Sequence, residues 1–190
     1  MSDLYMLPVK WVCNTNCVFC NFYETKWKID EEKHFEDLKS EIDSLDIKLV
    51  KEVNVGVNWY EPTVFKYFFE TLEYIKRYWF KINLFTNGVK LSDEKFVIKL
   101  SDFVSNVMIT LYSSNDEEHH ILTQNQDSYE VKLNAISNCL KHWIIPIQTL
   151  SAVAVAQAQL ARKFRALQSV PVQKPVREAL AVHLCWPTRD

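Results

Sequence analysis

The sequence has 190 residues, of which 48% are hydrophobic and 24% are charged. This composition provides enough apolar residues for one sizeable core and excludes an intrinsically disordered chain. The formal net charge is −2 and no dense basic stripe is present, so we expect no nucleic acid and no anionic membrane among its partners.

The chain opens without the charged and apolar regions of a secretion signal, and its longest apolar runs are too short to span a bilayer. We therefore expect a cytoplasmic protein. Thiols stay reduced in that compartment, so the five cysteines are expected to bind a metal or take part in catalysis rather than to form disulfides.

Short runs rich in β-branched and aromatic residues recur along the chain, with room for a helix between them. The expected strands are residues 4–12, 53–57, 80–85, 107–111 and 143–150. In the last of these runs, Pro146 lacks a backbone donor for the sheet and favours a position at its edge.

Between the strands, apolar residues recur at the three- and four-residue spacing of helices. The expected buried faces are Phe35, Leu38, Ile42 and Leu45; Val64, Phe68, Leu72 and Ile75; Phe96, Val97 and Leu100; and Val131, Ala135 and Cys139. Ser92 and Ser128 are expected to cap the last two helices. Strands that alternate with helices predict parallel pairing through right-handed crossovers, in either an open doubly wound sheet or a barrel.

The composition changes abruptly after residue 150. Residues 1–150 contain one alanine and one arginine, whereas residues 151–190 contain eight alanines and four arginines. We therefore divide the chain into a main domain, residues 1–150, and a compositionally distinct helical segment with a tail, residues 151–190. The origin and role of the second part stay open.

Three of the five cysteines, Cys13, Cys17 and Cys20, lie within eight positions after the first expected strand. Soft thiolates at this density suit zinc or an iron–sulfur cluster. A structural zinc site needs four ligands, typically two pairs, and no second pair is present. His34 lies beyond the usual ligand spacing, and Cys139 is more simply a buried thiol on an apolar helical face. Three thiolates would leave one iron of a four-iron cluster open to another molecule.

The CxxxCxxC motif of Cys13, Cys17 and Cys20, with Phe19 before the third cysteine, resembles the signature of radical SAM enzymes. In that family S-adenosylmethionine chelates the open iron of a [4Fe-4S] cluster. The reduced cluster cleaves it, which yields a 5′-deoxyadenosyl radical that abstracts hydrogen from a substrate. The resemblance implies both cofactors here, and an electron donor such as a flavodoxin or ferredoxin.

A second segment that resembles the family is VGVNWYEPT, residues 55–63, at the end of the second expected strand. The family has a Gly-Gly-Glu-Pro loop there, which approaches the methionine amine of the cofactor. Glu61 and Pro62 match this loop, whereas Trp59 and Tyr60 replace both glycines. Bulky residues do not take up the positive φ angles of glycine cheaply, so the approach of this backbone to the cofactor is expected to differ.

LFTNG (84–88) and ITLYSSNDEEHHILT (109–123), which follow the third and fourth expected strands, also resemble the family at matching positions. The residues that the resemblance implies at the cofactor are Phe19, Tyr60, Glu61, Asn87 and Ser113.

Several of these residues have a simpler interpretation as well. Glu61 could equally be a solvated loop carboxylate, and Asn87 and Gly88 suit a turn with or without a cofactor. His119 and His120 follow three acidic residues at a polar helix start. We expect these two histidines to be exposed or to cap the helix rather than to form a metal or acid–base site.

The resemblance also implies the fold, which is α/β: a partial, parallel (β/α) barrel of the TIM type. The family barrel has six βα units, and we find four with a fifth strand, so we expect a barrel that is incomplete at its C-terminal side. The implied activity is hydrogen abstraction from a small-molecule or peptide substrate, with a ribosomal peptide or cofactor precursor as the leading candidates. A catalytically inactive truncated remnant of the family and a zinc-binding structural or interaction module remain as alternatives.

Overall fold

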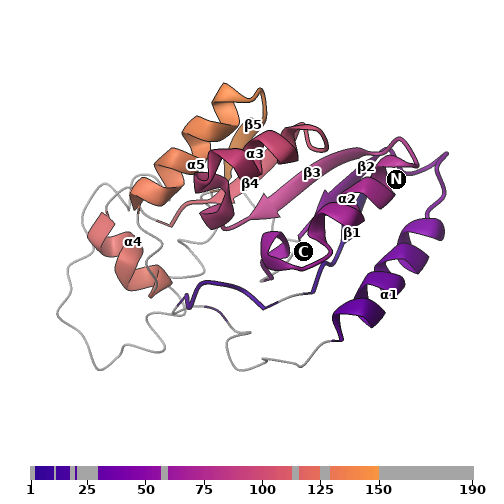
Figure 1. The fold of residues 1–190 in the computed structure, drawn as a ribbon, viewed down its shortest axis with the longest axis horizontal. Helices are drawn as coiled ribbons and strands as arrows, with labels where there is room; N and C mark the ends of the chain where they lie inside the picture. Colours follow the sequence, from indigo (N-terminus) through magenta and orange to yellow (C-terminus); the bar gives the residue numbers. More distant parts are fainter. Residues whose placement is uncertain are drawn as a thin grey trace, which may run out of the picture.

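The computed structural model describes residues 3–10, 12–17, 20, 30–56, 60–112, 116–124 and 129–149. Within this part of the chain, five strands form one parallel sheet in the order β1-β2-β3-β4-β5 (Figure 1). The strands are β1 (Leu4–Leu7), β2 (Glu52–Val55), β3 (Lys81–Thr86), β4 (Asn106–Thr110) and β5 (Ile145–Thr149). Pro146 lies in β5, which is an edge of this sheet as predicted.

The strand order favours the barrel arrangement over the doubly wound one. Right-handed crossovers that always lead to the next strand in the same direction place all the helices on one face of the sheet. In a doubly wound sheet the order reverses at a switch point, and the helices cover both faces. The predicted parallel α/β fold is therefore confirmed, in an open and partial form with β1 and β5 at its edges.

The helices α1, α2, α3 and α5 follow one another across the sheet in chain order, and α4 lies apart from this row (Figure 1). The α-helices are α1 (Glu31–Asp43), α2 (Phe68–Lys76), α3 (Glu94–Ser101), α4 (Asp116–Thr123) and α5 (Tyr129–Lys141). Two short 3-10 helices, η1 (Pro62–Val64) and η2 (Val89–Ser92), follow β2 and β3. The link from β4 to β5 thus contains two helices where the sequence predicts one clear helical face.

Local chemistry shortens some of the predicted elements. The first strand ends at Leu7 rather than at residue 12, because Pro8 has no N–H for the ladder and the N–H of Val9 turns back to the carbonyl of Leu7, at 3.0 Å. The second ends before Gly56, which has a φ of 82°.

Two predictions about the helices are wrong in detail. Val64 belongs to η1, and α2 begins only at Phe68, because Phe65 is extended and interrupts the helical path. Ser92 ends η2 and does not cap α3; the cap is Asp93, which accepts a hydrogen bond from the N–H of Lys95 at 3.0 Å. The predicted cap Ser128 and the segment 151–190 lie outside the described residues.

The core lies between the sheet and its helices. Alternate residues of the strands face the helices and are buried: Leu7, Val53, Val55, Ile82, Leu84, Val107 and Ile109. They belong to one cluster with the apolar faces of the helices: Leu38, Ile42, Leu72, Ile75, Val97, Leu100, Ala135 and Cys139. The predicted interpretation of Cys139 as a buried thiol is confirmed, and burial raises its pKa to about 11.

The opposite face of the sheet carries a row of asparagines. Asn54, Asn83 and Asn106 are register partners on β2, β3 and β4. The amide of Asn106 donates to Asn83 at 2.9 Å, and the amide of Asn83 donates to Asn54 at 2.8 Å. The side-chain carbonyls of Asn83 and Asn54 each accept a hydrogen bond from the amide of the neighbouring asparagine. The row therefore satisfies much of its own hydrogen-bonding capacity within the sheet.

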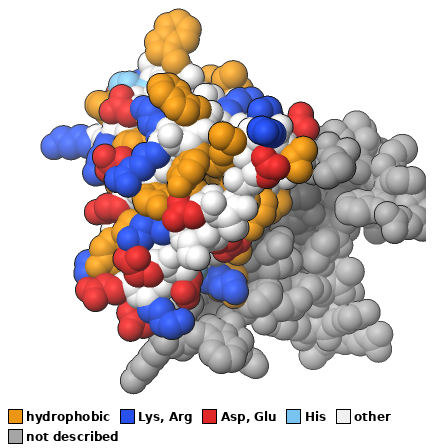
Figure 2. Space-filling model, turned by 90° about the vertical axis from the view of Figure 1, so that its right-hand side faces the viewer, with side chains coloured by type: hydrophobic (Ala, Val, Ile, Leu, Met, Phe, Trp, Pro, Cys, Tyr) orange, Lys and Arg blue, Asp and Glu red, His pale blue; other side chains and the backbone are white. Residues whose placement is uncertain are grey.

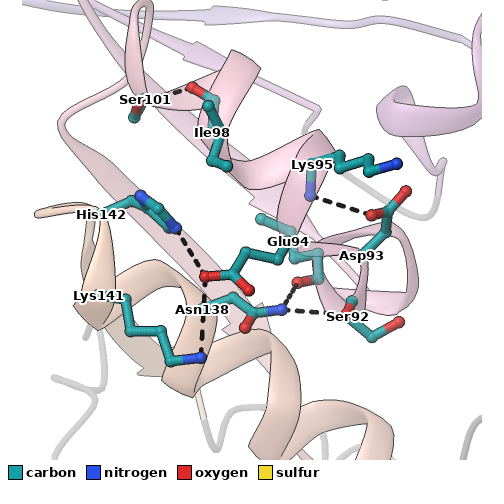
Figure 3. A network of polar contacts seen from close by, with 10 residues as sticks. Ser92, Asp93, Glu94, Lys95, Ile98, Ser101, Asn138, Lys141 and His142 are labelled. Atoms are coloured by element: carbon teal, nitrogen blue, oxygen red, sulfur yellow. Dashed lines mark hydrogen bonds and ion pairs between the residues drawn. The ribbon is translucent and has the colours of Figure 1, made fainter.

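Polar contacts join α5 to η2 and to the start of α3 (Figure 3). The side-chain amide of Asn138 donates to the carbonyls of Leu91 and Ser92, at 3.1 and 3.0 Å. Glu94 contacts His142 at 3.1 Å and Lys141 at 3.8 Å. Asn138 is buried whereas the Glu94 contacts are exposed, so we attribute the strength of this junction mainly to Asn138.

The surface mixes both signs of charge. Figure 2 shows one face of the molecule, on which acidic and basic side chains are interspersed rather than separated. Among the described residues, no helix is long and apolar enough to cross a bilayer.

Replacement of Asn138 by alanine tests the polar junction. We expect Asn138→Ala to lower the free energy of unfolding by roughly 1–3 kcal/mol, because the buried carbonyl of Leu91 and the part-buried carbonyl of Ser92 lose their donor. The measurement is urea denaturation followed by circular dichroism. Lys141→Ala, which removes an exposed contact from the same helix, is the control and should change little; equal effects of the two variants would contradict the assignment.

Candidate functional site

The predicted site residues that the structure describes gather at the carboxyl ends of the parallel strands, where the segments that follow β1 to β4 meet. The segment that follows β1 contains the three cysteines; we refer to residues 13–20 as the cysteine loop, of which the structure describes residues 13–17 and Cys20. This end of the sheet is where barrels of parallel strands place their sites.

The thiols of the cysteine loop lie close to a shared hydroxyl group. The Thr15 hydroxyl lies 3.1 Å from the sulfur of Cys13 and 3.5 Å from that of Cys17. The N–H of Cys20 donates to the carbonyl of Cys17 at 2.9 Å, which turns the loop back on itself. Cys17 is buried, and Cys13 and Cys20 are half-buried. All three are free thiols.

The surroundings of Cys13 and Cys17 oppose the ionisation of their thiols. Burial raises the pKa of Cys17 to about 11, and the neighbouring Cys13 and Cys20 add to the increase, whereas the Thr15 hydroxyl lowers it. Burial also raises the pKa of Cys13. Sulfurs in such surroundings need a positive partner to become thiolates, and a bound metal centre supplies that charge.

The donor set suits an iron–sulfur cluster. Among the described residues, no three His, Cys, Asp or Glu side chains form a group that could hold a single metal ion. In a four-iron cluster each thiolate binds a different iron, so the ligands do not converge on one point. Three thiols on one loop, with Cys17 in electrostatic reach of the other two, fit that requirement.

Two further elements hold the cysteine loop in place. The N–H of Asn16 donates to the carbonyl of Thr123 at the end of α4, at 3.1 Å. The thiol of Cys17 lies 4.0 Å from the hydroxyl of Tyr112, just after β4. The loop therefore reaches from the end of β1 across to the far side of the described sheet.

Glu61 joins the loops that follow β2 and β3. Its side chain is 1% exposed, so the interpretation as a solvated loop carboxylate is wrong. One oxygen accepts from the N–H and hydroxyl of Thr63, at 3.1 and 2.5 Å, and from the hydroxyl of Thr86 at 2.7 Å. The other accepts from the N–H of Asn87 at 2.6 Å. Burial raises the pKa of Glu61, and these donors oppose the increase.

The two glycines of the chain flank this arrangement. Gly56 and Gly88 both have a φ of 82° and follow β2 and β3. A Cβ on Gly56 would lie 2.6 Å from the carbonyl oxygen of Phe85, and one on Gly88 would lie 2.8 Å from Ile109. Only glycine fits either position. The close backbone approach between the end of β2 and strand β3 therefore occurs at Gly56, which precedes in the sequence the Trp59 and Tyr60 that replace the family glycines.

Asn87 connects this framework to the cysteine loop. Its side-chain amide donates to Asn14 at 2.7 Å and lies 3.6 Å from the sulfur of Cys13. Its backbone carbonyl accepts from the side-chain nitrogen of Lys132, which is 0% exposed on α5. The sequence analysis missed Lys132. The signal was present, because Lys132 is spaced three and seven residues from Ala135 and Cys139 on the buried face of that helix.

The remaining candidates have varied surroundings. Tyr60 is half-buried, directly before Glu61. His34 accepts a hydrogen bond from the N–H of Lys10 at 3.0 Å, so it joins α1 to the segment after β1. Phe19, Trp59 and Ser113 lie outside the described residues.

The prediction for the two histidines of α4 is half right. His120 is exposed, as expected. His119 is fully buried, and its ring lies 5.8 Å from that of Tyr112, so the expectation of an exposed side chain is wrong. It lies on the face of α4 that packs toward the end of β4.

Comparison with known protein families identifies the chain. The family model described as the radical SAM superfamily matches residues 12–153, which include the cysteine loop and the strands β2 to β5. The chain belongs to the radical SAM superfamily. The resemblance inferred from the cysteine motif is thereby confirmed.

Similar proteins cover parts of the chain. Mycofactocin maturase MftC of Mycolicibacterium smegmatis is 30% identical over 129 residues, which are 67% of this chain and 32% of that protein. The 7,8-dihydro-6-hydroxymethylpterin dimethyltransferase of Methanocaldococcus jannaschii is 25% identical over 68% of this chain and 26% of its own length. The chain thus spans about a third or less of these relatives.

A solved structure also overlaps the chain. It is described as the structure of TYW1 with a lysine-pyruvate adduct bound, and it matches with a TM-score of 0.44 and 18% identity. The overlap covers 77% of this chain and 50% of that one.

Removal of the Glu61 carboxylate tests its role in this radical SAM chain. We expect Glu61→Ala to lower the free energy of unfolding by more than about 2 kcal/mol, because several buried donors lose their acceptor together. The measurement is urea denaturation of the metal-free protein. Glu73→Ala, at an exposed carboxylate of α2, is the control. A loss no larger than that of the control would show that Glu61 does not hold the two loops.

Proposed function

We propose that Cys13, Cys17 and Cys20 bind a [4Fe-4S] cluster and that the chain cleaves S-adenosylmethionine to begin hydrogen abstraction from a substrate. The observation that carries this proposal is the placement of three free thiols on one loop, at the carboxyl ends of a parallel sheet, in a member of the radical SAM superfamily. Most donor sets for a single metal ion would instead bring four ligands together.

When bound, the cluster supplies the electron for reductive cleavage of S-adenosylmethionine. The protein's own part is to place three sulfurs and to limit the access of water. The Thr15 hydroxyl lies between Cys13 and Cys17, and the burial of Cys17 keeps solvent from the deepest of the three positions. The contacts to Thr123 and Tyr112 support the loop from the far side.

For the S-adenosylmethionine site we propose the segments that follow β2, β3 and β4. Both oxygens of Glu61 accept hydrogen bonds from within the protein, so we propose that Glu61 contributes by holding its loop. We propose two further residues for this site: Tyr60, which directly precedes Glu61, and Asn87, which contacts the cysteine loop. Phe19 and Ser113 stay predictions from the resemblance.

The proposed substrate is a small molecule or a peptide, with a ribosomally made peptide as the first candidate. One relative is named as a maturase and another as a pterin dimethyltransferase, which supports this breadth of substrate classes. We further propose that the chain acts in the cytoplasm and receives its electron from a flavodoxin or ferredoxin. Nucleic acid and membrane are not proposed as partners.

Anaerobic reconstitution with iron and sulfide tests the proposal. We expect the protein to turn brown, to bind roughly four iron atoms per chain, and to release 5′-deoxyadenosine when dithionite and S-adenosylmethionine are added. Cys17→Ala should reduce both iron binding and nucleoside release to background, because too few ligands remain. Cys139→Ala is the control and should retain both, since that thiol lies in the helical core.

Two outcomes would replace the proposal with a different function. Iron binding without nucleoside release would indicate a catalytically inactive member of the superfamily. A colourless protein that binds zinc through the same cysteines and does not respond to dithionite would indicate a structural or interaction module.

A further inference from the structure

Every polar group of Asn87 has a partner within the protein. Its backbone N–H donates to Glu61 at 2.6 Å, and its backbone carbonyl accepts from Lys132. Its side-chain oxygen accepts from the N–H of Val89 at 3.0 Å. Its side-chain nitrogen donates to Asn14 at 2.7 Å and points a second hydrogen at Cys13, whose sulfur lies 3.6 Å away.

The orientation of this amide follows from its partners. The N–H of Val89 requires an acceptor, so the oxygen must face it and the nitrogen must face the cysteine loop. In the opposite orientation two donors would face each other at Val89, and the sulfur of Cys13 would face an oxygen. The nitrogen–sulfur contact is thus determined by groups outside the cysteine loop.

The supports of Asn87 are buried and come from three directions. Glu61 reaches it from the loop after β2, and Lys132 reaches it from α5. Thr86 donates to Glu61 at 2.7 Å and accepts from the N–H of Gly88 at 3.0 Å, which fixes the turn on either side of Asn87. A side chain held in this way presents its donor in a constant position, as preorganised sites require.

An N–H donor that contacts a ligand sulfur raises the reduction potential of an iron–sulfur cluster. Reduction adds negative charge to an iron–sulfur cluster, and a hydrogen bond to sulfur stabilises that charge. The donor therefore raises the reduction potential, which makes the electron easier to load. Cys13 also contacts the Thr15 hydroxyl, so the two polar neighbours of this sulfur differ in origin: Thr15 belongs to the loop itself, whereas Asn87 belongs to the rigid framework.

From these contacts we infer that Asn87 is a positioning residue for the metal centre: its side-chain amide donates to the sulfur of Cys13, fixes the cysteine loop against the end of β3, and raises the reduction potential of the bound cluster. The inference about the potential rests on the proposed function. The inference about the contact concerns the protein alone and can be tested without iron.

The decisive variant is Asn87→Asp. It keeps the shape and the oxygen that faces Val89, but it replaces the donor by an acceptor. We expect the equilibrium constant for reduction to fall at least tenfold, which is ~59 mV for a one-electron couple, in a redox titration of the reconstituted full chain followed by electron paramagnetic resonance. Asn87→Ala, which removes the donor without adding charge, should shift the potential in the same direction.

Asn16→Asp is the matched control. It introduces the same charge into the cysteine loop, at an exposed side chain three residues from Cys13. We expect a clearly smaller shift than for Asn87→Asp. Equal shifts of the two variants, or an unchanged potential in Asn87→Ala, would reduce the effect to charge alone and overturn the inference about the potential.

Nuclear magnetic resonance of the metal-free, ¹⁵N-labelled chain separates this inference from the proposed function. The side-chain amide signal of Asn87 should move in Cys13→Ala and stay in place in Cys20→Ala. A signal that is indifferent to Cys13 overturns the contact. If the signal moves but the wild type assembles no cluster, the proposed function fails while the positioning contact stands.

Discussion

The arrangement of the site depends on one buried carboxylate. A parallel sheet brings the carboxyl ends of its strands to one edge, but it does not fix the loops that follow them. Glu61 does so, because its two oxygens accept hydrogen bonds from the nearby Thr63 and from Thr86 and Asn87 at the end of β3. A charge that is 1% exposed is costly unless several donors compensate it, so the two loops are stable mainly in this mutual arrangement. The irregular cysteine loop then has a rigid neighbour to contact.

The elements of the fold could be predicted from the sequence because their signals are local. Apolar periodicity located all five strands and the buried faces of α1, α3 and α5. Where the bounds were wrong, single residues decided them: Pro8 ends β1 early, and Asp93 takes the capping role expected of Ser92. Either residue could cap a helix, and the choice depends on where η2 ends, which in turn depends on its packing against α5.

The site could be predicted only where residue type and spacing carry the chemistry. The cysteine triplet and the motif positions Glu61 and Asn87 were identifiable in this way. The hydrogen-bond partner of Lys132 and the burial of His119 were not. The spacing of Lys132 to Ala135 and Cys139 places it on the buried face of α5, but a lysine and a histidine among acidic or polar neighbours are ordinarily solvent-exposed. Their burial is decided by partners distant in the sequence, such as the carbonyl of Asn87, 45 residues before Lys132. Long-range hydrogen bonds of this kind have no periodic signature.

The second face of the described sheet is buried in its middle, where Asn54 is 4% and Asn83 is 7% exposed, and is exposed at its edges. Apolar side chains on that face are exposed at the edges, where Met6 is 43% and Ile145 is 60% exposed. The middle of the face is different, because the asparagine row of β2, β3 and β4 passes its hydrogen bonds from strand to strand. Amides paired in this way lose little free energy whether water or protein covers them. An unpaired amide would instead need a hydrogen-bond partner in whatever covers this face.

The hydrogen bonding of the asparagine row therefore does not depend on a closed barrel. The apolar edges are the part of this face that further contacts would stabilise most. The site lies at the carboxyl ends of the same strands. Its framework consists of Glu61, Asn87 and Lys132. These residues come from the segments after β2 and β3 and from α5, all of which belong to the described part of the chain. The end of the sheet that lies beside the cysteine loop can thus be ordered by contacts within this portion of the fold.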